Sequence, residues 1–475
     1  MPAGRAHSDA ERGVAGHGAA VPRGQDRDAG RDPPRGRFGR MFPDLAACSA
    51  SVDALHALAD SMKRRESSGD NTEIPAGFTY LGQFIDHDIT FDPTSLHDRR
   101  RDPHALENFR TPRFDLDSVY GSGPVVQPFL YDWKEYDPPG VKLLVGHNAI
   151  DGTDDLPRNQ QGRAVIADAR NDEHRIIAQL HLLFVRFHNA VVDHLKSKKV
   201  PDEKLLGEAQ ELTRWHYQWI IVHEFLPKIL GEDLAEVDRE HFKWQREPFI
   251  PVEFSAAAYR FGHSMIRDAY GIRRRPEGGE VQHAIPLFPQ LAGFTWLPRR
   301  LTIDWERFFM LPGVKREPQA SFQIDTAIAS PLLHLPEGDA ELPRRNLLRG
   351  HKLELPSGQD VACAMHRPRL TEQQLQLGDV KNTRLRAELL ASTPLWYYIL
   401  AEAESEHGDS GAHLGPVGGR IVAEVFIGLL EGDPCSYLRR DPGWHPSDLG
   451  RSFDMGRLVT FVEESEARRR NLGRS

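Results

Sequence analysis

The sequence has no long hydrophobic run. A membrane-spanning helix needs roughly 18 consecutive apolar residues, and the longest candidate segment, Val417 to Leu430, is interrupted by Gly, Arg and Glu. The opening residues MPAGRAHSDAERG also lack the apolar core of about 7 to 15 residues that a secretory signal peptide requires. We therefore expect a cytoplasmic protein without a transmembrane segment, with non-classical export as an open alternative.

Cysteine is also scarce, and negative charge exceeds positive charge. The three cysteines, Cys48, Cys363 and Cys435, are far apart and odd in number, which excludes a disulfide framework and a cysteine-rich metal site. Lysine and arginine number 60 against 69 aspartate and glutamate, a formal net charge of -9. A protein that binds nucleic acid normally presents a strongly basic face, so we expect no nucleic-acid partner.

The first 40 residues contain few apolar side chains. They are rich in Gly, Arg, Asp and Pro, and Phe38 is their only aromatic residue. So little apolar surface does not offset the entropy lost on ordering, and residues 1–40 are predicted to form a disordered arm. The remainder, residues 41–475, shows no repeat and no break in composition, which predicts a single large domain.

Alternation typical of strands is scarce, and helical spacing dominates. Apolar residues recur every three or four positions in the segment 171–195, which predicts one long amphipathic helix capped at Asn171 or Asp172. Further helices are predicted for residues 208–230, ending at Gly231, and for residues 251–270. Frequent Pro and Gly between these segments indicate long irregular loops. The predicted fold is mainly α, with few short strands.

Polar side chains gather in three segments that are otherwise apolar or precede apolar helices. In YLGQFIDHDITFDP, residues 80–93, Gln83, Asp86, His87 and Asp88 lie close together in an otherwise apolar run, and DARNDEH, residues 168–174, precedes the long predicted helix. The segment AYRFGHSM carries His263 beside Gly262, where a flat ligand can approach closely. Taken singly, these segments are more typical of a solvated helix end, a capping cluster and a packed core histidine.

Together and in this order, GQFIDHD, DARNDEH followed by LHLLFVRFHN, and YRFGHSM resemble the motifs of the animal haem peroxidase family. This family includes myeloperoxidase-like enzymes and, more distantly, the cyclooxygenases. Two later segments also match it, RNLLRGHKLELPSGQ from Arg345 and VGGRIVAEVFIGLL from Val417. The resemblance extends from about Thr79 to Leu430 and implies a helical haem peroxidase-like domain over residues 41–475.

The resemblance implies that hydrogen peroxide forms a ferryl intermediate that oxidises small organic donors or halides. His87 matches the residue that moves a proton between the two peroxide oxygens, a task that suits an imidazole with an ordinary pKa of about 6.5. Arg170 matches the fixed cation beside the departing oxygen. Gln83 matches the glutamine on the halide side of the site.

A bound haem b is the cofactor that the resemblance implies. His263 matches the ligand of the haem iron, and Asn346 matches the acceptor that makes this imidazole more anionic. Arg260 and Arg349 match residues that pair with the haem propionates.

Ester links to the haem are also implied. Asp86 and Glu173 match the two carboxylates that form ester bonds with haem methyl groups in family members. The methionine that forms a third link in some members is replaced by His174, so at most two esters are expected.

The segment RTPRFDLDSVYGS, residues 110–122, resembles the calcium loop of the family. Oxygen ligands rich in carboxylates suit this hard cation. The implied ligands are Thr111, the carbonyl group of Arg113, Asp115 and Asp117, with Asp88 contributed from beside His87.

Two other functions remain alternatives. In the cyclooxygenase and dioxygenase branch, a tyrosine three residues before the proximal histidine abstracts hydrogen from a fatty acid, but that position is Arg260 here. Tyr259 lies one residue earlier, about 100° around an α-helix. The second alternative is a binding or adhesion protein that retains haem without turnover, which would not need His87 and Arg170.

Overall fold

The computed structural model describes residues 36–63, 69–91, 107–231, 239–244, 247–273, 284–335, 341–450 and 452–472. Residues 1–35 of the predicted arm lie outside these ranges. The end of the arm was predicted wrongly, because Gly36–Gly39 form strand β1. Phe38 in this strand is 3% exposed, so burial of one aromatic ring and pairing with two other strands order a segment whose composition alone indicates disorder.

The described part of the chain is mainly helical, as predicted. Its α-helices are Val52–Ser61 (α1), Ala76–Ile89 (α2), Asp117–Tyr120 (α3), Arg175–Ser197 (α4), Asp202–Ile220 (α5), Leu226–Leu230 (α6), Val252–Ser255 (α7), Leu342–Lys352 (α8), Gly358–Ala364 (α9), Thr383–Ala391 (α10), Leu395–Glu404 (α11), Pro416–Gly432 (α12), Tyr437–Arg440 (α13) and Met455–Leu472 (α14). Among its other helical turns are two 3₁₀ helices, Ala169–Asp172 (η3) and Ala258–His263 (η5), and a π-helical turn, Ile221–Phe225 (η4).

The strands in the described residues are short, as predicted. They are Gly36–Gly39 (β1), Asp70–Pro75 (β2), Glu107–Asn108 (β3), Gly146–His147 (β4), Asp154–Asp155 (β5), Ile250–Pro251 (β6), Ala269–Tyr270 (β7), Ile285–Pro286 (β8) and Ala320–Phe322 (β9). Strand β1 pairs antiparallel with β3 and parallel with β6. The other pairs, β2 with β9, β4 with β5 and β7 with β8, are antiparallel.

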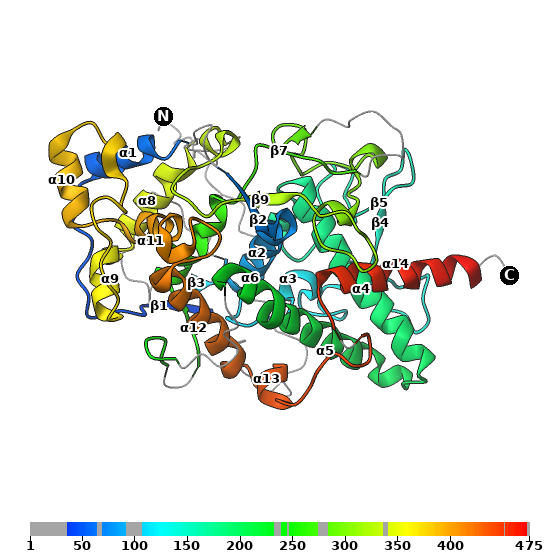
Figure 1. Cartoon of the computed structure of the whole chain (residues 1–475). Coiled ribbons are helices and arrows are strands. Elements are labelled where there is room, and N and C mark those ends of the chain that lie inside the picture. Colours follow the sequence, from blue (N-terminus) through cyan, green and yellow to red (C-terminus); the bar gives the residue numbers. More distant parts are fainter. Residues whose placement is uncertain are drawn as a thin grey trace, which may run out of the picture.

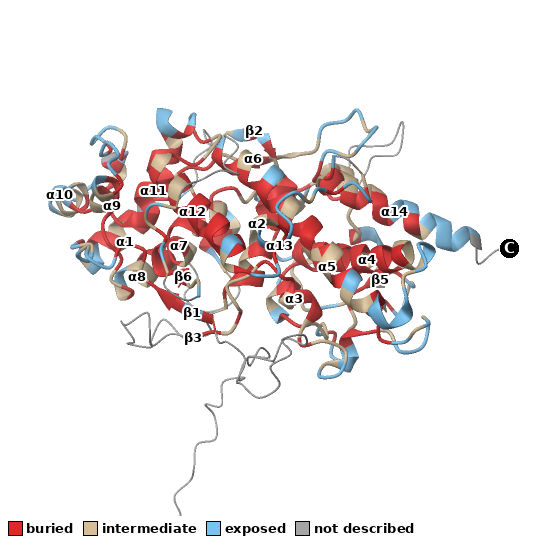
Figure 2. Ribbon diagram, turned by 90° about the horizontal axis from the view of Figure 1, so that it is seen from below, coloured by how far each residue is buried: buried red, intermediate tan, exposed pale blue. Residues whose placement is uncertain are grey.

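Helix α2 lies near the middle of the molecule, with α8 to α11 on one side and α4, α5 and α14 on the other (Figure 1). It contacts both α4 and η5. Buried residues fill the facing sides of the central helices, while the end of α14 is exposed (Figure 2). One buried hydrophobic cluster extends from Phe38 to Val462. Within the described ranges, no helix has the length and apolar character needed to cross a bilayer.

The long helix α4 is amphipathic as predicted, but it begins later than expected. Its N-cap is His174, whose ring Nδ1 accepts from the Ile177 N–H. The predicted caps are occupied elsewhere: Asn171 bonds to His87, and Asp172 pairs with Arg158. These two side chains thus form hydrogen bonds with residues distant in sequence instead of capping the helix.

The predicted helix over residues 208–230 ends where expected, but it begins earlier than predicted. Helix α5 begins at Asp202, directly after Pro201, and runs through η4 into α6. Gly231 follows with φ +71°, the left-handed conformation that glycine adopts readily at helix C-termini.

The predicted continuous helix over residues 251–270 is wrong. Helix α7 stops at Ser255, and His263 ends the separate 3₁₀ helix η5. The Ser255 carbonyl, which an α-helix would pair with the Tyr259 N–H, instead accepts from Arg260 Nε at 3.0 Å. Side chains three residues apart eclipse in a 3₁₀ helix, so Arg260 and His263 lie on the same side of η5.

Glu253 links α7 by hydrogen bonds to the segment that follows β1. Its carboxylate is fully buried and accepts from the N–H groups of Met41 and Phe42 at 3.0 and 3.2 Å. Glu253→Ala is expected to lower the free energy of unfolding by on the order of 1–3 kcal/mol, because it leaves two buried donors unpaired. Urea unfolding measures the change. Glu253→Gln keeps one acceptor oxygen and should lose less; an alanine variant as stable as the wild type would contradict this anchoring role.

Candidate functional site

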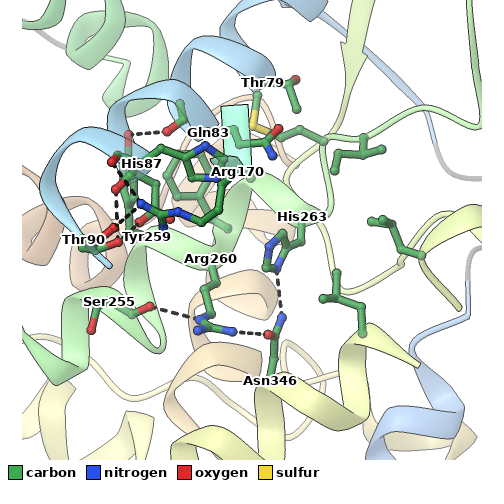
Figure 3. A pocket seen from close by; sticks show the side chains of 18 of the residues that line it. Thr79, Gln83, His87, Thr90, Arg170, Ser255, Tyr259, Arg260, His263 and Asn346 are labelled. Carbon is green, nitrogen blue, oxygen red and sulfur yellow. Dashed lines mark hydrogen bonds between the residues drawn. The ribbon is translucent and has the colours of Figure 1, made fainter. Parts of the chain in front are cut away.

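A cavity of about 540 Å³ lies between α2, the start of α4, η5 and α8. Its volume is in the range of ordinary ligand and cofactor sites. It is lined by every residue predicted to take part in catalysis or to hold the haem: Gln83, Asp86, His87, Arg170, Glu173, Arg260, His263, Asn346 and Arg349. His87 and Arg170 lie together on one side, and His263 is linked to Asn346 on the other (Figure 3).

Helix α2 presents its polar residues to this cavity because of their spacing. Gln83, Asp86 and His87 follow one another at intervals of three and one, which places them on adjacent turns of one helix face. The apolar residues between them point the other way, and Phe84 stacks on Phe184 of α4 with ring centroids 4.6 Å apart. Packing against α4 therefore turns the polar face of α2 towards the cavity.

His87 is buried and has a fixed hydrogen-bond partner. Its Nδ1 lies 2.8 Å from the side-chain oxygen of Asn171. An amide oxygen only accepts, so Nδ1 donates the hydrogen bond. Burial, with the nearby charge of Arg170, lowers the pKa of His87 to about 3. A neutral ring that carries its proton on Nδ1 leaves Nε2 unprotonated, as a general base requires.

Arg170 is held by the buried carboxylate of Asp168. Its Nε and Nη2 donate to the two oxygens of Asp168 at 3.1 and 2.7 Å, and Nη2 also donates to the His87 and Thr90 carbonyls. Arg110 donates to the same carboxylate at 2.6 Å. Burial alone would raise the pKa of Asp168, but the two guanidinium groups lower it well below its ordinary value. The remaining nitrogen, Nη1, has no hydrogen-bond partner within the described ranges.

Gln83 is oriented by His174. Because His174 Nδ1 accepts from the Ile177 N–H, and because burial lowers the pKa of His174 to about 3, the neutral ring carries its proton on Nε2. This Nε2 lies 2.8 Å from Gln83 Oε1 and donates to it. The amide N–H groups of Gln83 are therefore the ones left for the cavity, so Gln83 offers donors beside His87.

On the opposite side, the predicted contact between His263 and Asn346 is present, and in the chain by itself Asn346 is the donor. Arg260 donates to Asn346 Oδ1, so the Asn346 amide nitrogen donates to His263 Nδ1 at 2.9 Å. The sequence predicted Asn346 as the acceptor for a histidine that binds haem iron; in the chain alone, Arg260 occupies the Asn346 oxygen. Burial and the charges of Arg260 and Arg345 lower the pKa of His263 to about 3, so the neutral ring carries its proton on Nε2.

The predicted propionate partners, Arg260 and Arg349, both line the cavity, and burial lowers the pKa of each. Arg345 lines it as well, and the sequence had marked Arg345 only as the start of a motif. Buried guanidinium groups favour an anionic partner. Gly262 adjoins open space, since no described atom would lie within 4 Å of a Cβ added there. These features fit a flat cofactor that carries carboxylates, as haem does.

The two predicted ester-forming carboxylates differ in environment. Asp86 is partly buried and its Oδ1 accepts from Thr90 Oγ1 at 2.9 Å. Burial raises its pKa, although Arg170 opposes the shift. Glu173 is exposed and lines the cavity. The structure thus brings both carboxylates to the surface of the same cavity.

Three of the predicted calcium ligands also come together. Oxygens of Asp88, Asp115 and Asp117 all lie within 4.8 Å of one another. Burial, followed by the charges of Asp115 and Asp117, raises the pKa of Asp88 well above its ordinary value. The hydroxyl of Thr111 is buried and has no hydrogen-bond partner in the described part of the chain. A cation among the three carboxylates would relieve their mutual repulsion, and a buried hydroxyl without a partner is a suitable further oxygen donor, so the donor types fit calcium.

Arg113 and Arg110 flank this loop. The side chain of Arg113 points to Asp433, with a closest distance of 3.8 Å, so only its backbone carbonyl is available to a cation. Arg110 lies 3.5 Å from Asp117 and also binds Asp168. One arginine therefore connects the loop to the residue that holds Arg170.

Sequence reasoning missed three residues at the site. Asn171 was considered only as a helix cap, and Asp168 and His181 were not considered. A seven-residue spacing of His174, His181 and His188 marks one face of α4, and all three are buried. This periodicity of histidine in an apolar helix is a signal that could have identified His181.

Comparisons with known proteins agree with this geometry. A family model described as animal haem peroxidase matches residues 97–292, a range that contains Arg170 and His263. Chorion peroxidase of Drosophila melanogaster is 26% identical over 358 residues, which cover 70% of this chain and 42% of that protein. Peroxidasin of Drosophila melanogaster is 32% identical over 339 residues, which cover 66% of this chain and 21% of that protein. The chain thus spans less than half the length of either relative.

Solved structures share the fold. Peroxidase A from Dictyostelium discoideum superposes with a TM-score of 0.64 at 15% identity, covering 95% of this chain and 97% of that chain. The fatty acid alpha-dioxygenase of Oryza sativa superposes with a TM-score of 0.59 at 15% identity, covering 88% of this chain and 78% of that chain. The family model and the curated relatives thus identify an animal haem peroxidase region in this chain, and the solved structures show that it shares the fold.

Proposed function

We propose that the protein is a haem-dependent peroxidase that uses hydrogen peroxide to oxidise small organic donors or halides. The observation that carries the proposal is the placement of a neutral, unprotonated His87 Nε2 and an oriented Arg170 across one cavity from His263. A binding protein would need no such pair. The similarity to animal haem peroxidases supports the same activity.

The chain offers residues that would hold haem. His263 would bind the iron, and Arg260 and Arg349 would pair with the propionates. Bound haem supplies the iron whose oxidation state changes during the reaction. Binding of iron by His263 Nε2 requires the ring proton to move to Nδ1 and the Asn346 amide to turn so that its oxygen accepts. Propionates that draw Arg260 away from Asn346 would permit this turn.

The residues around the cavity would then act on peroxide directly. His87 Nε2 accepts a proton from one peroxide oxygen and returns it to the other. Arg170 Nη1 donates to the oxygen on which negative charge grows. Asp168 keeps the guanidinium in place, and the Gln83 amide supplies a further donor for peroxide or for a halide ion.

His87→Ala is expected to reduce the peroxidase activity of the haem-loaded protein by about 10²- to 10⁴-fold, because proton transfer by a positioned base contributes that much. Turnover of a chromogenic phenol with hydrogen peroxide measures the effect. His445→Ala removes an exposed histidine and serves as the control, with wild-type activity expected. Equal rates for His87→Ala and wild type would contradict the proposed role and favour a protein that retains haem only for binding or adhesion.

A fatty-acid oxygenase is the second candidate, supported by the shared fold with alpha-dioxygenases and by Tyr259, which lines the cavity. The Tyr259 hydroxyl donates to the Gly82 carbonyl at 3.2 Å, an interaction that would have to break for hydrogen abstraction. In the same preparations, linoleate without added peroxide should therefore cause no oxygen uptake. Uptake that depends on Tyr259 would favour the oxygenase.

Covalent attachment of haem through Asp86 and Glu173 is part of the proposal. After incubation with peroxide, part of the haem is expected to stay with the denatured wild-type chain on a gel stained for haem. The double variant Asp86→Asn, Glu173→Gln should release all of it, because an amide does not form the ester. His174 offers no thioether, so no link beyond these two is expected. Haem that migrates wholly with the dye front in the wild type would refute attachment.

A structural calcium ion is proposed among Asp88, Asp115, Asp117, Thr111 and the Arg113 carbonyl. Calcium should raise the thermal midpoint of the wild type, because an ion that binds only the folded state stabilises it by about 2.7 kcal/mol at 100 times its dissociation constant. Asp115→Asn should gain less from calcium and lose less on chelation, since it relieves repulsion within the cluster. Asp44→Ala, at an exposed carboxylate, is the control. A midpoint unaffected by calcium or chelator would contradict the site.

A further inference from the structure

We propose that Asn171 and His181 are positioning residues that hold His87 in the tautomer whose Nε2 is free to accept a proton. The inference rests on the proposed function, since it assigns His87 its role as a base, but the tautomer itself is a property of the chain. Neither Asn171 nor His181 lines the cavity, so both would act through His87.

Three buried side chains form a continuous hydrogen-bonded row behind the cavity. His87 Nδ1 lies 2.8 Å from Asn171 Oδ1, and Asn171 Nδ2 lies 3.0 Å from His181 Nδ1. The exposed fractions of His87, Asn171 and His181 are 5%, 0% and 1%. Water therefore does not compete for these contacts, and each buried polar atom depends on its protein partner.

The orientation of the Asn171 amide sets which atom donates and which accepts in both hydrogen bonds. The amide nitrogen of Asn171 can only donate, so His181 Nδ1 accepts. The amide oxygen can only accept, so His87 Nδ1 donates. A turned amide would place its nitrogen against His87 Nδ1, which would move the proton to Nε2 and block the base. The same turn would set the amide oxygen against the unprotonated His181 Nδ1, so it is opposed unless His181 changes its tautomer as well.

The packing of the helices that contain these three residues keeps them within hydrogen-bond distance of one another. Asn171 lies in η3 beside Arg170, and His181 lies two turns into α4, while His87 lies on α2. Helices α2 and α4 pack against each other. The contact between these two helices thus sets both the position of Arg170 and the tautomer of His87.

The test compares two substitutions of similar size at one position. Asn171→Asp keeps an acceptor for His87 Nδ1, and Asn171→Leu removes it. The full-length chain is labelled with ¹⁵N-histidine and loaded with zinc protoporphyrin, a diamagnetic analogue of haem. Two-bond ¹H–¹⁵N spectra then report which nitrogen of His87 carries the proton, and the signal of His87 is assigned by its absence in His87→Ala.

Wild type and Asn171→Asp are expected to carry the proton on Nδ1, whereas Asn171→Leu should show the Nε2 tautomer or a mixture. His181→Leu should give a mixture, because the amide is then free to turn. In haem-loaded protein, the reaction with peroxide should slow by at least about tenfold in Asn171→Leu and be restored by Asn171→Asp.

An Nδ1 proton on His87 in Asn171→Leu, or a reaction as slow in Asn171→Asp as in Asn171→Leu, would overturn the inference. The two measurements, the tautomer by NMR and the rate of reaction with peroxide, also distinguish failure of this inference from failure of the proposed function. Tautomers that respond as expected in a protein that does not react with peroxide would refute the peroxidase and still support the positioning role of Asn171.

Discussion

The carboxylate of Asp168 is the point on which the rest of the site depends. It is buried, it accepts from the N–H of Arg170 at the start of η3, and it pairs with the guanidinium groups of both Arg170 and Arg110. Removal of one partner from such a buried cluster typically costs about 3–5 kcal/mol, because the remaining charges lose their compensation. Through Arg110 the same carboxylate is coupled to the carboxylate cluster at Asp88 and Asp117. Arg170 and the predicted calcium site are thus linked through one network of ion pairs.

Histidine and arginine have separate tasks in this cavity. Burial lowers the pKa of His87, His174 and His263 to about 3 in each case, so these rings are neutral at physiological pH and act as directional hydrogen-bonding groups. Positive charge comes from arginine, which keeps its proton even when buried. A cavity with neutral bases and fixed cations suits a reaction in which a proton is moved while negative charge develops.

Much of this arrangement could be predicted from the sequence. The helical spacing of the α4 segment, the stop at Gly231 and the three ordered motifs indicate the fold class and the residues that meet at the cavity. Local periodicity cannot show which partner a polar side chain selects in three dimensions. For that reason the start of α4 and the continuous helix over residues 251–270 were predicted wrongly. The cap at His174 and the end of α7 at Ser255 depend on partners that the local sequence does not reveal.

The central claim is that His263 and the arginines of this cavity hold haem. The most direct measurement is a titration of the purified chain with haem, followed by absorption spectroscopy, for wild type and His263→Ala. The account predicts one haem per chain in the wild type, with a Soret band typical of iron bound by histidine, and loss or displacement of that band in the variant. A wild-type protein without a Soret band from bound haem, or a variant with an identical spectrum and affinity, would contradict it.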